Sequence, residues 1–383
     1  MSEHFDLVIA GGSFAGLACA RTAALRGLKV AVLDPKLEPG ARPRTTGIVV
    51  KEACDDFDLP AHLMRKVRGV RLYAPDDRAL DLHAPGYVFQ AADTPALLRW
   101  MADEAARAGA TLLYGRGFDH ANLHERRVEL PSLGLSASFL IGADGARSRV
   151  AVACGLGRNE RFLVGIEIEC EPLQVIDPRF LHCFADSRLA PGYIGWVVPG
   201  VNATQIGVAA SRQARPDLRL LLDRLQAIGS IGRLRVMAKR GGLIPCGGTL
   251  RRLGSACVLL IGDAAGLVSP VTGGRHSHRA AFRPARRTVR LGLSGRSRPA
   301  SGRSLFAGGA AISREKAAEA RTRLRPAQRA DQCHPADGAD AGFGAAALLP
   351  QPGQQCRRLR SLVAGATASR AKAIRQAGHR RLT

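Results

Sequence analysis

The chain has 383 residues, of which 46% are hydrophobic, and its formal net charge is +24. This length and hydrophobic content are enough for a large buried core, which excludes a wholly disordered or fibrous protein. The first residues enter an apolar strand without a basic leader segment, and no apolar run long enough to span a bilayer follows. We therefore expect a cytoplasmic protein.

The positive charge is concentrated at the C-terminal end. Residues 275–383 carry +18 of the charge through 21 Arg and 2 Lys, and they contain three Phe but neither Trp nor Tyr. The preceding 274 residues carry only +6. Because Arg, Ala, Gly, Pro and Ser dominate the C-terminal segment, we expect a basic, low-complexity and disordered tail.

The first predicted elements form a strand–turn–helix–strand unit. Residues 6–10 are an apolar run typical of a buried parallel strand, 11–16 form a tight turn, 17–25 an Ala-rich helix and 28–33 a second strand. Such a unit presents backbone N–H groups and a helix N-terminus to a pyrophosphate, while an acidic residue about 20 positions on, here Asp34, accepts hydrogen bonds from a ribose. This arrangement predicts dinucleotide binding.

The turn departs from the usual glycine pattern. Aligned on Gly16, the pattern reads Gly11, Ser13, Gly16, so serine replaces the second glycine and adds a Cβ where the phosphates approach. An ordinary strand–turn–helix junction is the alternative. The Ala-rich helix and the spacing of Asp34 favour the nucleotide site.

A second helix is predicted in the segment "TPALLRWMADEAARAG". Thr94 and Pro95 are expected to be its N-cap and first-turn residues, and Gly109 is expected to end it in the left-handed conformation. The apolar strand at 110–115 follows directly, so the helix belongs with the nucleotide domain.

Two further acidic turns follow apolar strands. In "FLIGADGARSRVAVACGL", Asp144 and Gly145 lie between a strand and a helix expected to start at 147–149, and in "VLLIGDAAGLVSP" Asp263 follows another strand. Each aspartate alone is most simply an N-cap. In this order after the N-terminal unit, the motifs resemble the three signatures of the FAD-dependent oxidoreductases that share the aromatic-hydroxylase fold.

This resemblance implies an α/β fold, with a Rossmann-like FAD-binding domain and an inserted antiparallel β-sheet substrate domain. It implies that the N-terminal turn and Asp144 lie at the FAD pyrophosphate, Asp34 at the adenosine ribose and Asp263 at the ribityl chain. The cofactor-binding residues that we expect are Gly11, Gly12, Ser13, Ala15, Gly16, Asp34, Arg44, Asp144, Gly145, Gly262, Asp263, Gly273 and Gly274.

Within that superfamily, the segments "GYIGWVVPG", "GLIPCGGTLRRL" and "GDAAGLVSPVTGG" look most like the geranylgeranyl reductase group. The group carries an aromatic residue, a Trp and a Pro on a substrate strand, which here implies substrate contacts for Tyr193, Trp196 and Pro199. The sequence departs from the pattern because Ile194 stands where the aromatic usually lies. A tryptophan in the core of a sheet is the alternative for Trp196.

The motifs predict a discontinuous FAD domain. We expect it to comprise residues 1–70, 94–162 and 245–274, with an excursion into the substrate sheet at 71–93. Residues 163–244 alternate polar and apolar side chains, which predicts an antiparallel substrate sheet covering the isoalloxazine ring.

The predicted reaction passes hydride from NAD(P)H through FAD to an alkene of a prenyl or other apolar substrate, which needs little acid–base chemistry from the protein. NAD(P)H is expected to bind transiently because no second glycine fingerprint is present, and no residue is assigned as catalytic. Residues 1–274 show neither a hydrolase triad spacing nor a His cluster, so no metal site is expected. Arg42 and Arg44 either contact FAD or the NADPH phosphate, or are solvated loop charges.

Two other classes remain open. One is an FAD-dependent aromatic monooxygenase, which uses the same fold. The other is a nucleic-acid-binding protein, and the only support for that interpretation is the basic tail, which lacks the interleaved aromatic residues expected of a base-stacking platform. We expect no nucleic-acid partner, and a lipid substrate would bring peripheral contact with a membrane.

The abrupt change after Gly274 suggests a frameshift. The reductase group continues there with a helix reading approximately "GGGIHTALRFGRRAA", whereas this chain reads "GGRHSHRAAFRPARR". Codons can be chosen for residues 275–279 that, read one base later into the following alanine codon, encode Gly, Ile, His, Thr, Ala; the third bases are free, but the fixed bases allow each residue. We therefore hypothesise that residues 275–383 are a frameshift product and that the chain as written lacks activity; a genuine basic tail is the alternative.

Overall fold

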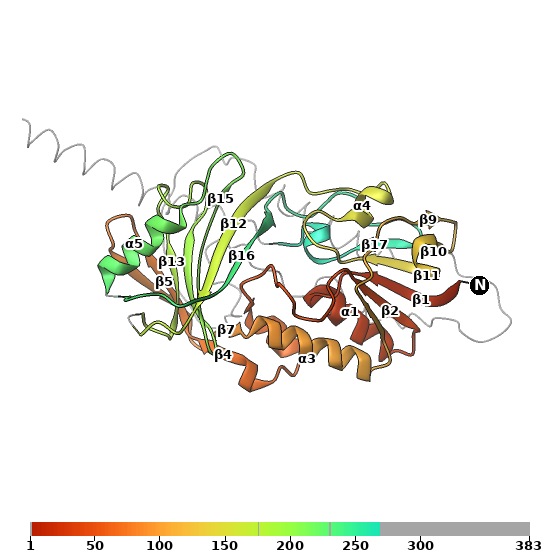
Figure 1. The fold of residues 1–383 in the computed structure, drawn as a ribbon, viewed down its shortest axis with the longest axis horizontal. Coiled ribbons are helices and arrows are strands. Elements are labelled where there is room, and N and C mark those ends of the chain that lie inside the picture. The colour runs from red at the N-terminus through yellow and green to blue at the C-terminus, as the bar shows by residue number, and fades with distance from the viewer. Residues whose placement is uncertain (1, 175, 230, 269–383) are drawn as a thin grey trace, which may run out of the picture. The chain divides into compact units, whose positions relative to one another are not determined.

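The computed structural model describes residues 2–174, 176–229 and 231–268 (Figure 1). Gly273, Gly274 and the tail at 275–383 lie outside these ranges, so what was expected of them stays a prediction. The described part contains two seven-stranded sheets and one three-stranded sheet.

The first sheet is built on five parallel strands. Their spatial order is β8 (Thr111–Tyr114), β2 (Val30–Asp34), β1 (Glu3–Ala10), β11 (Leu135–Gly142) and β17 (Val258–Leu260). Two short antiparallel strands, β10 (Val128–Leu130) and β9 (Asn122–Leu123), continue the sheet beyond the first residues of β11. Both neighbours of β1 are parallel to it, as a Rossmann-like domain requires.

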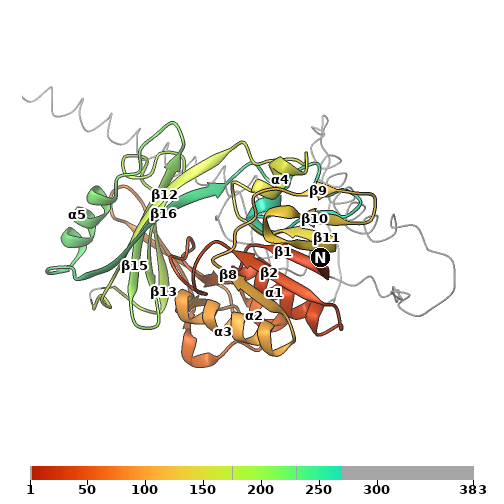
Figure 2. The same cartoon turned by 45° about the vertical axis from the view of Figure 1, so that its right-hand side comes forward.

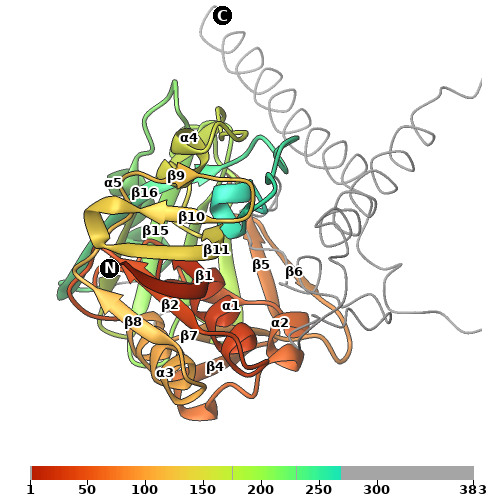
Figure 3. The same cartoon turned by 90° about the vertical axis from the view of Figure 1, so that its right-hand side faces the viewer.

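Helices cover both faces of this sheet, because alternate residues of each strand point to opposite sides. Helix α1 (Phe14–Ala24) packs Cys19 and Ala20 against Ile9, and α3 (Thr94–Arg107) packs against α1. The short helix α4 (Arg149–Ala153) packs Val150 with Val8 on the other face (Figure 3). The predicted Rossmann-like α/β fold is confirmed.

The start of α3 corrects one prediction. Asp93, not Thr94, is the N-cap, and its carboxylate accepts a hydrogen bond from the backbone N–H of Ala96 at 3.1 Å. Thr94 is the first helical residue and is fully buried, whereas Pro95 lies in the first turn as expected. Gly109 follows the helix with φ +101°, which confirms the predicted left-handed end.

The second sheet is antiparallel except for one parallel pair, β13 with β5. Its order is β16 (Val236–Pro245), β12 (Phe162–Cys170), β15 (Thr204–Ser211), β14 (Gly195–Pro199), β13 (Phe180–Phe184), β5 (Gly69–Tyr73) and β6 (Ala79–His83). Strands β5 and β6 precede α3 in the chain; β5 begins two residues before the excursion expected at 71–93, and β6 lies within it.

A helix interrupts the region expected to be sheet. Helix α5 (Leu218–Ile228) is capped by Asp217 and buries Leu221 and Leu225 against one face of the second sheet (Figures 1 and 2). The sequence "LRLLLDRLQAI" places these leucines on one side of a helix. The alternating pattern noted for 163–244 therefore does not hold at 218–228.

The third sheet is small and lies against the face of the second sheet opposite α5. It consists of β3 (Ile48–Val49), β7 (Phe89–Ala92) and β4 (Met64–Val67). Val67 and Ala91 of this sheet pack with Leu181 and Val198 of the second sheet. The helices α2 (Lys51–Asp56) and η1 (Ala61–Leu63) connect its strands, while η2 (Pro131–Leu133) precedes β11 and η3 (Gly262–Ala265) follows β17. None of the helices in the described ranges combines the length and apolarity needed to cross a bilayer.

Candidate functional site: a dinucleotide cradle at the ends of parallel strands

The three sequence motifs meet at one edge of the first sheet. Parallel strands end on the same side, so the turns after β1, β11 and β17 lie together. A Cβ atom on Gly11 would lie 2.3 Å from the carbonyl oxygen of Ala143, and one on Gly262 would lie 2.9 Å from the Cβ of Ala15. Gly11 also has φ +114°, which other residues rarely adopt. The structure therefore brings the N-terminal turn into contact with both later motifs.

The N-terminus of α1 opens onto this edge. Ser13 is its N-cap in extended conformation, its side chain makes no capping hydrogen bond, and the first turn contains no acidic residue. The first N–H groups of a helix have no intrahelical acceptor and favour a negative group. Ser13 is half-buried, so its Cβ is accommodated in the turn.

Asp34 ends β2 beside the turn. Its Oδ2 accepts a hydrogen bond from the backbone N–H of Gly12 at 2.8 Å, and its Oδ1 accepts one from the N–H of Lys36 at 2.9 Å. The residue is only 5% exposed. A carboxylate has about four acceptor positions, so two remain for the hydroxyls of a ribose.

Tyr114 is a residue at this edge that the sequence analysis missed. It ends β8 directly opposite Asp34, and its hydroxyl is buried without a hydrogen-bond partner among the described residues. Burial, followed by the charges of Asp34 and Asp103, raises the pKa of Tyr114 to about 12. The hydroxyl is therefore a neutral donor beside the predicted ribose position. Its place at the end of the strand "TLLY" was the available signal.

Asp144 binds the start of α4, whose N-cap residue is Ser148. Its Oδ1 accepts a hydrogen bond from Ser148 Oγ at 2.6 Å, and its Oδ2 accepts from the N–H groups of Arg149 and Val150 at 2.6 and 3.1 Å. The carboxylate thus binds N–H groups at the helix start, but the N-cap position expected for Asp144 is taken by Ser148; α4 starts where it was expected. Gly145 follows with φ +87°. The contact of both residues with the pyrophosphate stays a prediction.

Asp263 lies in η3, next to the N-terminal turn, and is half-buried. The side-chain amide of Asn159 donates hydrogen bonds to the backbone carbonyls of Asp263, at 2.8 Å, and Ala146, at 3.1 Å. Asn159 therefore ties the second motif to the third. The sequence analysis missed this residue, because it lies in a loop with no pattern of its own.

Trp196 lies on the face of the second sheet that looks toward the three-stranded sheet. It packs with Val198 and Leu181 near Phe89. Its indole N–H donates a hydrogen bond to Oε2 of Glu167 at 2.8 Å. Glu167 is almost fully buried and also contacts Arg240, and neither residue was singled out from the sequence.

The other two predicted substrate residues take different positions. Tyr193 is half-buried in the turn before β14, where burial raises its pKa, with a smaller contribution from the Cys183 thiol. Cys183 lies opposite Trp196 in the sheet. Pro199 is buried at the end of β14, and strand alternation places it on the α5 face with Val197. The structure therefore does not bring Pro199 to the surface that Trp196 lines.

The loop with Arg42 and Arg44 runs along β16. A Cβ on Gly242 would lie 3.9 Å from the Cβ of Arg44, and the carbonyl of Thr45 accepts a hydrogen bond from Arg240 at 3.4 Å. The side chains of Arg42 and Arg44 are exposed. Their position fits both alternatives, a cofactor contact and solvated loop charges.

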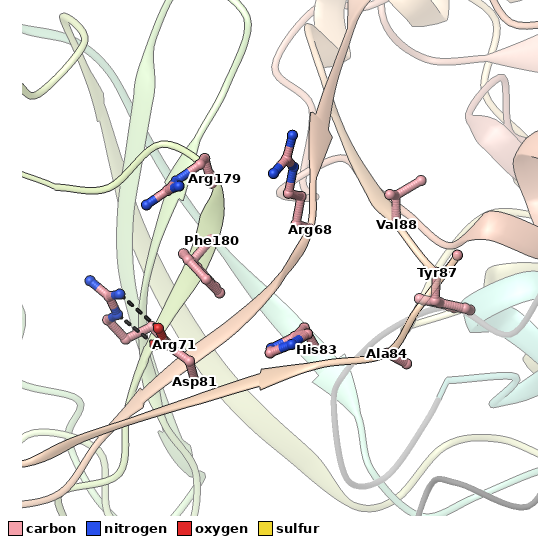
Figure 4. A pocket seen from close by; sticks show the side chains of 10 residues that line it. Arg68, Arg71, Asp81, His83, Ala84, Tyr87, Val88, Arg179 and Phe180 are labelled. Carbon is pink, nitrogen blue, oxygen red and sulfur yellow. Dashed lines mark hydrogen bonds and ion pairs between the residues drawn. The ribbon is translucent and has the colours of Figure 1, made fainter.

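A cavity of about 470 Å³ lies elsewhere, between β5, β6 and the loop at 84–88 (Figure 4). Arg71 on its wall makes hydrogen bonds of 2.6 and 2.8 Å to Asp81 and stacks over Phe180. None of the residues predicted from the sequence lines this cavity.

Comparison with known proteins identifies the family. The FAD binding domain family matches residues 4–274. Two curated relatives are a geranylgeranyl diphosphate reductase of Rhodobacter capsulatus, 28% identical over 70% of each chain, and a digeranylgeranylglycerophospholipid reductase of Methanothrix thermoacetophila, 29% identical over 70% of this chain and 73% of the relative.

Solved structures share the fold. A geranylgeranyl bacteriochlorophyll reductase-like protein of Thermoplasma acidophilum superposes with a TM-score of 0.63 at 23% identity, covering 71% of this chain and 74% of the other. The flavin-dependent monooxygenase PieE, solved with FAD and substrate, gives 0.52 at 17% identity, covering 68% and 53%. The family match spans well over half of the 383 residues and includes all three motifs at the cradle. The chain therefore belongs to the FAD binding domain family.

Proposed function

We propose that this protein is an FAD-dependent oxidoreductase that transfers hydride from NAD(P)H to an alkene of a prenyl or comparable apolar substrate. The observation that carries the proposal is the contact of the N-terminal turn with both later motifs, through Gly11 with Ala143 and Gly262 with Ala15. The names of the curated relatives, all reductases of geranylgeranyl compounds, support the substrate class.

The cradle fits FAD on several independent features. The glycine turn leaves no room for a Cβ at Gly11, the N-terminus of α1 has no side-chain cap, and the carboxylate of Asp34 has acceptor positions left. The hydroxyl of Tyr114, which has no hydrogen-bond partner among the described residues, needs a polar neighbour. Together these features suit a pyrophosphate flanked by a ribose.

The protein's own part in the reaction is binding and orientation. When bound, FAD supplies the hydride chemistry, and the nicotinamide donor would bind only transiently. The half-buried indole of Trp196 offers an apolar surface for a prenyl chain, and Tyr193 is half-buried in the turn before the same strand. A substrate of this kind brings the enzyme to a membrane surface peripherally, and we place the protein in the cytoplasm.

A direct test measures flavin content and then reduction without oxygen. Purified protein with the reading frame restored near codon 275 would be loaded with FAD and incubated anaerobically with NADPH or NADH and with geranylgeraniol or geranylgeranyl diphosphate. The masses of the products would be measured by mass spectrometry. A mass gain of two hydrogens per alkene supports the proposal. Hydroxylation of an aromatic compound with oxygen consumption, and no alkene reduction, would identify the alternative monooxygenase.

A further inference from the structure

A row of side chains crosses the second sheet beneath Trp196. Trp196 pairs with Gly207, Gly207 with Glu167, and Glu167 with Arg240, so four neighbouring strands contribute one residue each. Directly opposed residues point to the same face. The row therefore lies on the face toward the three-stranded sheet, which is the predicted substrate wall.

Gly207 lets the indole of Trp196 lie across the neighbouring strand. A Cβ at this position would lie 2.4 Å from the Trp196 ring and 2.8 Å from its Nε1. Because the glycine has no side chain, the indole spans β15 and reaches Glu167 two strands away, at 2.8 Å. The orientation of the ring is thus fixed at both ends, by Gly207 beneath it and by the carboxylate at its N–H.

Arg240 keeps the carboxylate in place. Its guanidinium contacts Glu167 at 3.4 Å and forms an ion pair with Glu169, and the side chains of Arg240 and Glu167 are 9% and 7% exposed. Buried charges need partners, and a well-packed apolar pair would often be as stable or more stable. Burial raises the pKa of Glu167, while Trp196 and Arg240 act in the opposite direction. Arg240 also donates to the Thr45 carbonyl, which connects the wall with the loop of Arg44.

We propose that Glu167 and Arg240 are positioning residues that hold the indole of Trp196 flat across Gly207 to form the wall of the prenyl-binding site. The orientation of the ring follows from the geometry above. The role of the oriented ring in recognising a prenyl chain rests on the proposed function. Glu167 and Arg240 thus act through Trp196 and not on the reacting atoms.

The test measures the environment of Trp196 through its fluorescence emission. The chain contains two tryptophans, so Trp100→Phe leaves Trp196 as the single emitter in the full 383-residue protein. Emission needs neither bound flavin nor turnover. Glu167→Ala removes the acceptor, Glu167→Gln keeps an acceptor oxygen, and Gly207→Ala displaces the ring without changing any charge. Glu171→Ala, an exposed glutamate just after the same strand, is the matched control.

We expect Glu167→Ala and Gly207→Ala to shift the emission of Trp196 and to raise its acrylamide quenching constant about twofold or more, since the ring loses its anchor. Glu167→Gln and Glu171→Ala should keep the parent signal. If Glu167→Ala does not fold, the emission and quenching of Gly207→Ala alone test the proposal. An unchanged signal in Gly207→Ala, or in a folded Glu167→Ala, overturns the proposal.

A titration with geranylgeraniol separates this proposal from the function on which it rests. Weaker binding to Glu167→Ala and Gly207→Ala than to the parent supports both. If the emission shifts but neither the parent nor the variants bind geranylgeraniol, the anchoring of Trp196 is supported and the proposed prenyl substrate is wrong. Equal binding to parent and variants, despite shifted emission, overturns the role of the anchored ring in recognition.

Discussion

Gly11 and Ala143 are in contact across two parallel strands, although one belongs to the first motif and the other to the second. A Cβ on Gly11 would come within 2.3 Å of the Ala143 carbonyl oxygen, and the backbone of Gly11 has φ +114°. The close approach and the positive φ both require glycine. The first turn is thus shaped by a neighbour more distant in sequence than any local pattern reveals.

In the frame-restored protein, Gly11→Ala should therefore release FAD and destabilise the first sheet. The added methyl group meets backbone atoms that cannot move without shifting β11, and a strained φ alone costs about 1–3 kcal/mol. Flavin absorbance per protein and the thermal midpoint both measure the effect. Gly27→Ala is the control, because Gly27 also has a positive φ but nothing lies within 4 Å of its Cβ position. Equal effects of the two substitutions would mean that conformation, not contact, matters at Gly11.

In the frame-restored protein, Asp263→Ala should lower flavin affinity while the fold is largely kept. The resemblance places this carboxylate at the ribityl chain, where a charge-assisted hydrogen bond contributes about 1.5–3 kcal/mol, or about 10- to 150-fold in Kd. Fluorescence titration with FAD measures the change, and circular dichroism monitors the fold. Asp223→Ala, at an exposed site on α5, is the control. An unchanged Kd would leave Asp263 as a purely structural residue of the turn.

Tyr114→Phe should keep or raise the stability of the cofactor-free protein and lower its affinity for FAD. Without cofactor, removing a buried hydroxyl that has no partner in the described part of the chain should leave the protein as stable or more stable, by up to about 1–3 kcal/mol. With FAD, the lost hydroxyl should weaken binding. Tyr73→Phe is the contrasting variant, because the Tyr73 hydroxyl hydrogen-bonds His182 at 3.0 Å. It should lower stability without changing flavin affinity. A Tyr114→Phe protein that is less stable and binds FAD normally contradicts the assignment.

In the frame-restored protein, Trp196→Ala should impair turnover more than flavin content. Removing the ring takes away the proposed apolar wall and with it about 1.5–3 kcal/mol of contact with the substrate, or about tenfold or more in kcat/KM. The FAD Kd should stay near the parent value, since the cradle lies on a different sheet. Trp196→Phe keeps most of the apolar surface, so its kcat/KM should lie between those of the parent and Trp196→Ala. Parallel loss of flavin and activity would make Trp196 a structural residue.

The sequence predicted what depends on local backbone rules. The turn at Gly11, the acidic end of β2 at Asp34 and the helix start after Asp144 follow from short-range patterns, and these were correct. Asp93 and Thr94 are both good caps in adjacent positions, and only the backbone conformation distinguishes them. The helix α5 was missed because a leucine-rich run was assigned with the strands around it.

The missed site residues depend on strand register. Tyr114 gains its place from pairing with β2, and Glu167 meets Trp196 only because β12, β15 and β14 align around Gly207. A single sequence does not specify such pairings between distant strands. The alternation "GIEIEC" did place Glu167 and Glu169 on one face, but such a face usually meets solvent, whereas here it is buried.

The last prediction concerns the chain after Gly274. The family match ends at residue 274, where the composition changes to the Arg-rich segment that carries +18 of the charge. A frameshift there keeps β17 and Asp263 but replaces the helix that the reductase group places next, whose N-terminus favours negative charge on the reduced flavin. Loss of such an element is serious, because a whole domain is stable by only about 5–15 kcal/mol.

We therefore expect the 383-residue chain to express poorly, to bind little FAD and to lack reductase activity. A one-base correction near codon 275 should restore all three properties and remove most of the positive charge. Sequencing the source DNA is the cheapest measurement: the shifted frame should encode a helix beginning Gly, Ile, His, Thr, Ala. A shifted frame that encodes no such helix, or a 383-residue chain that is yellow and active, would show that the basic tail is genuine. Salt-sensitive binding of the tail to nucleic acid would then become the next experiment.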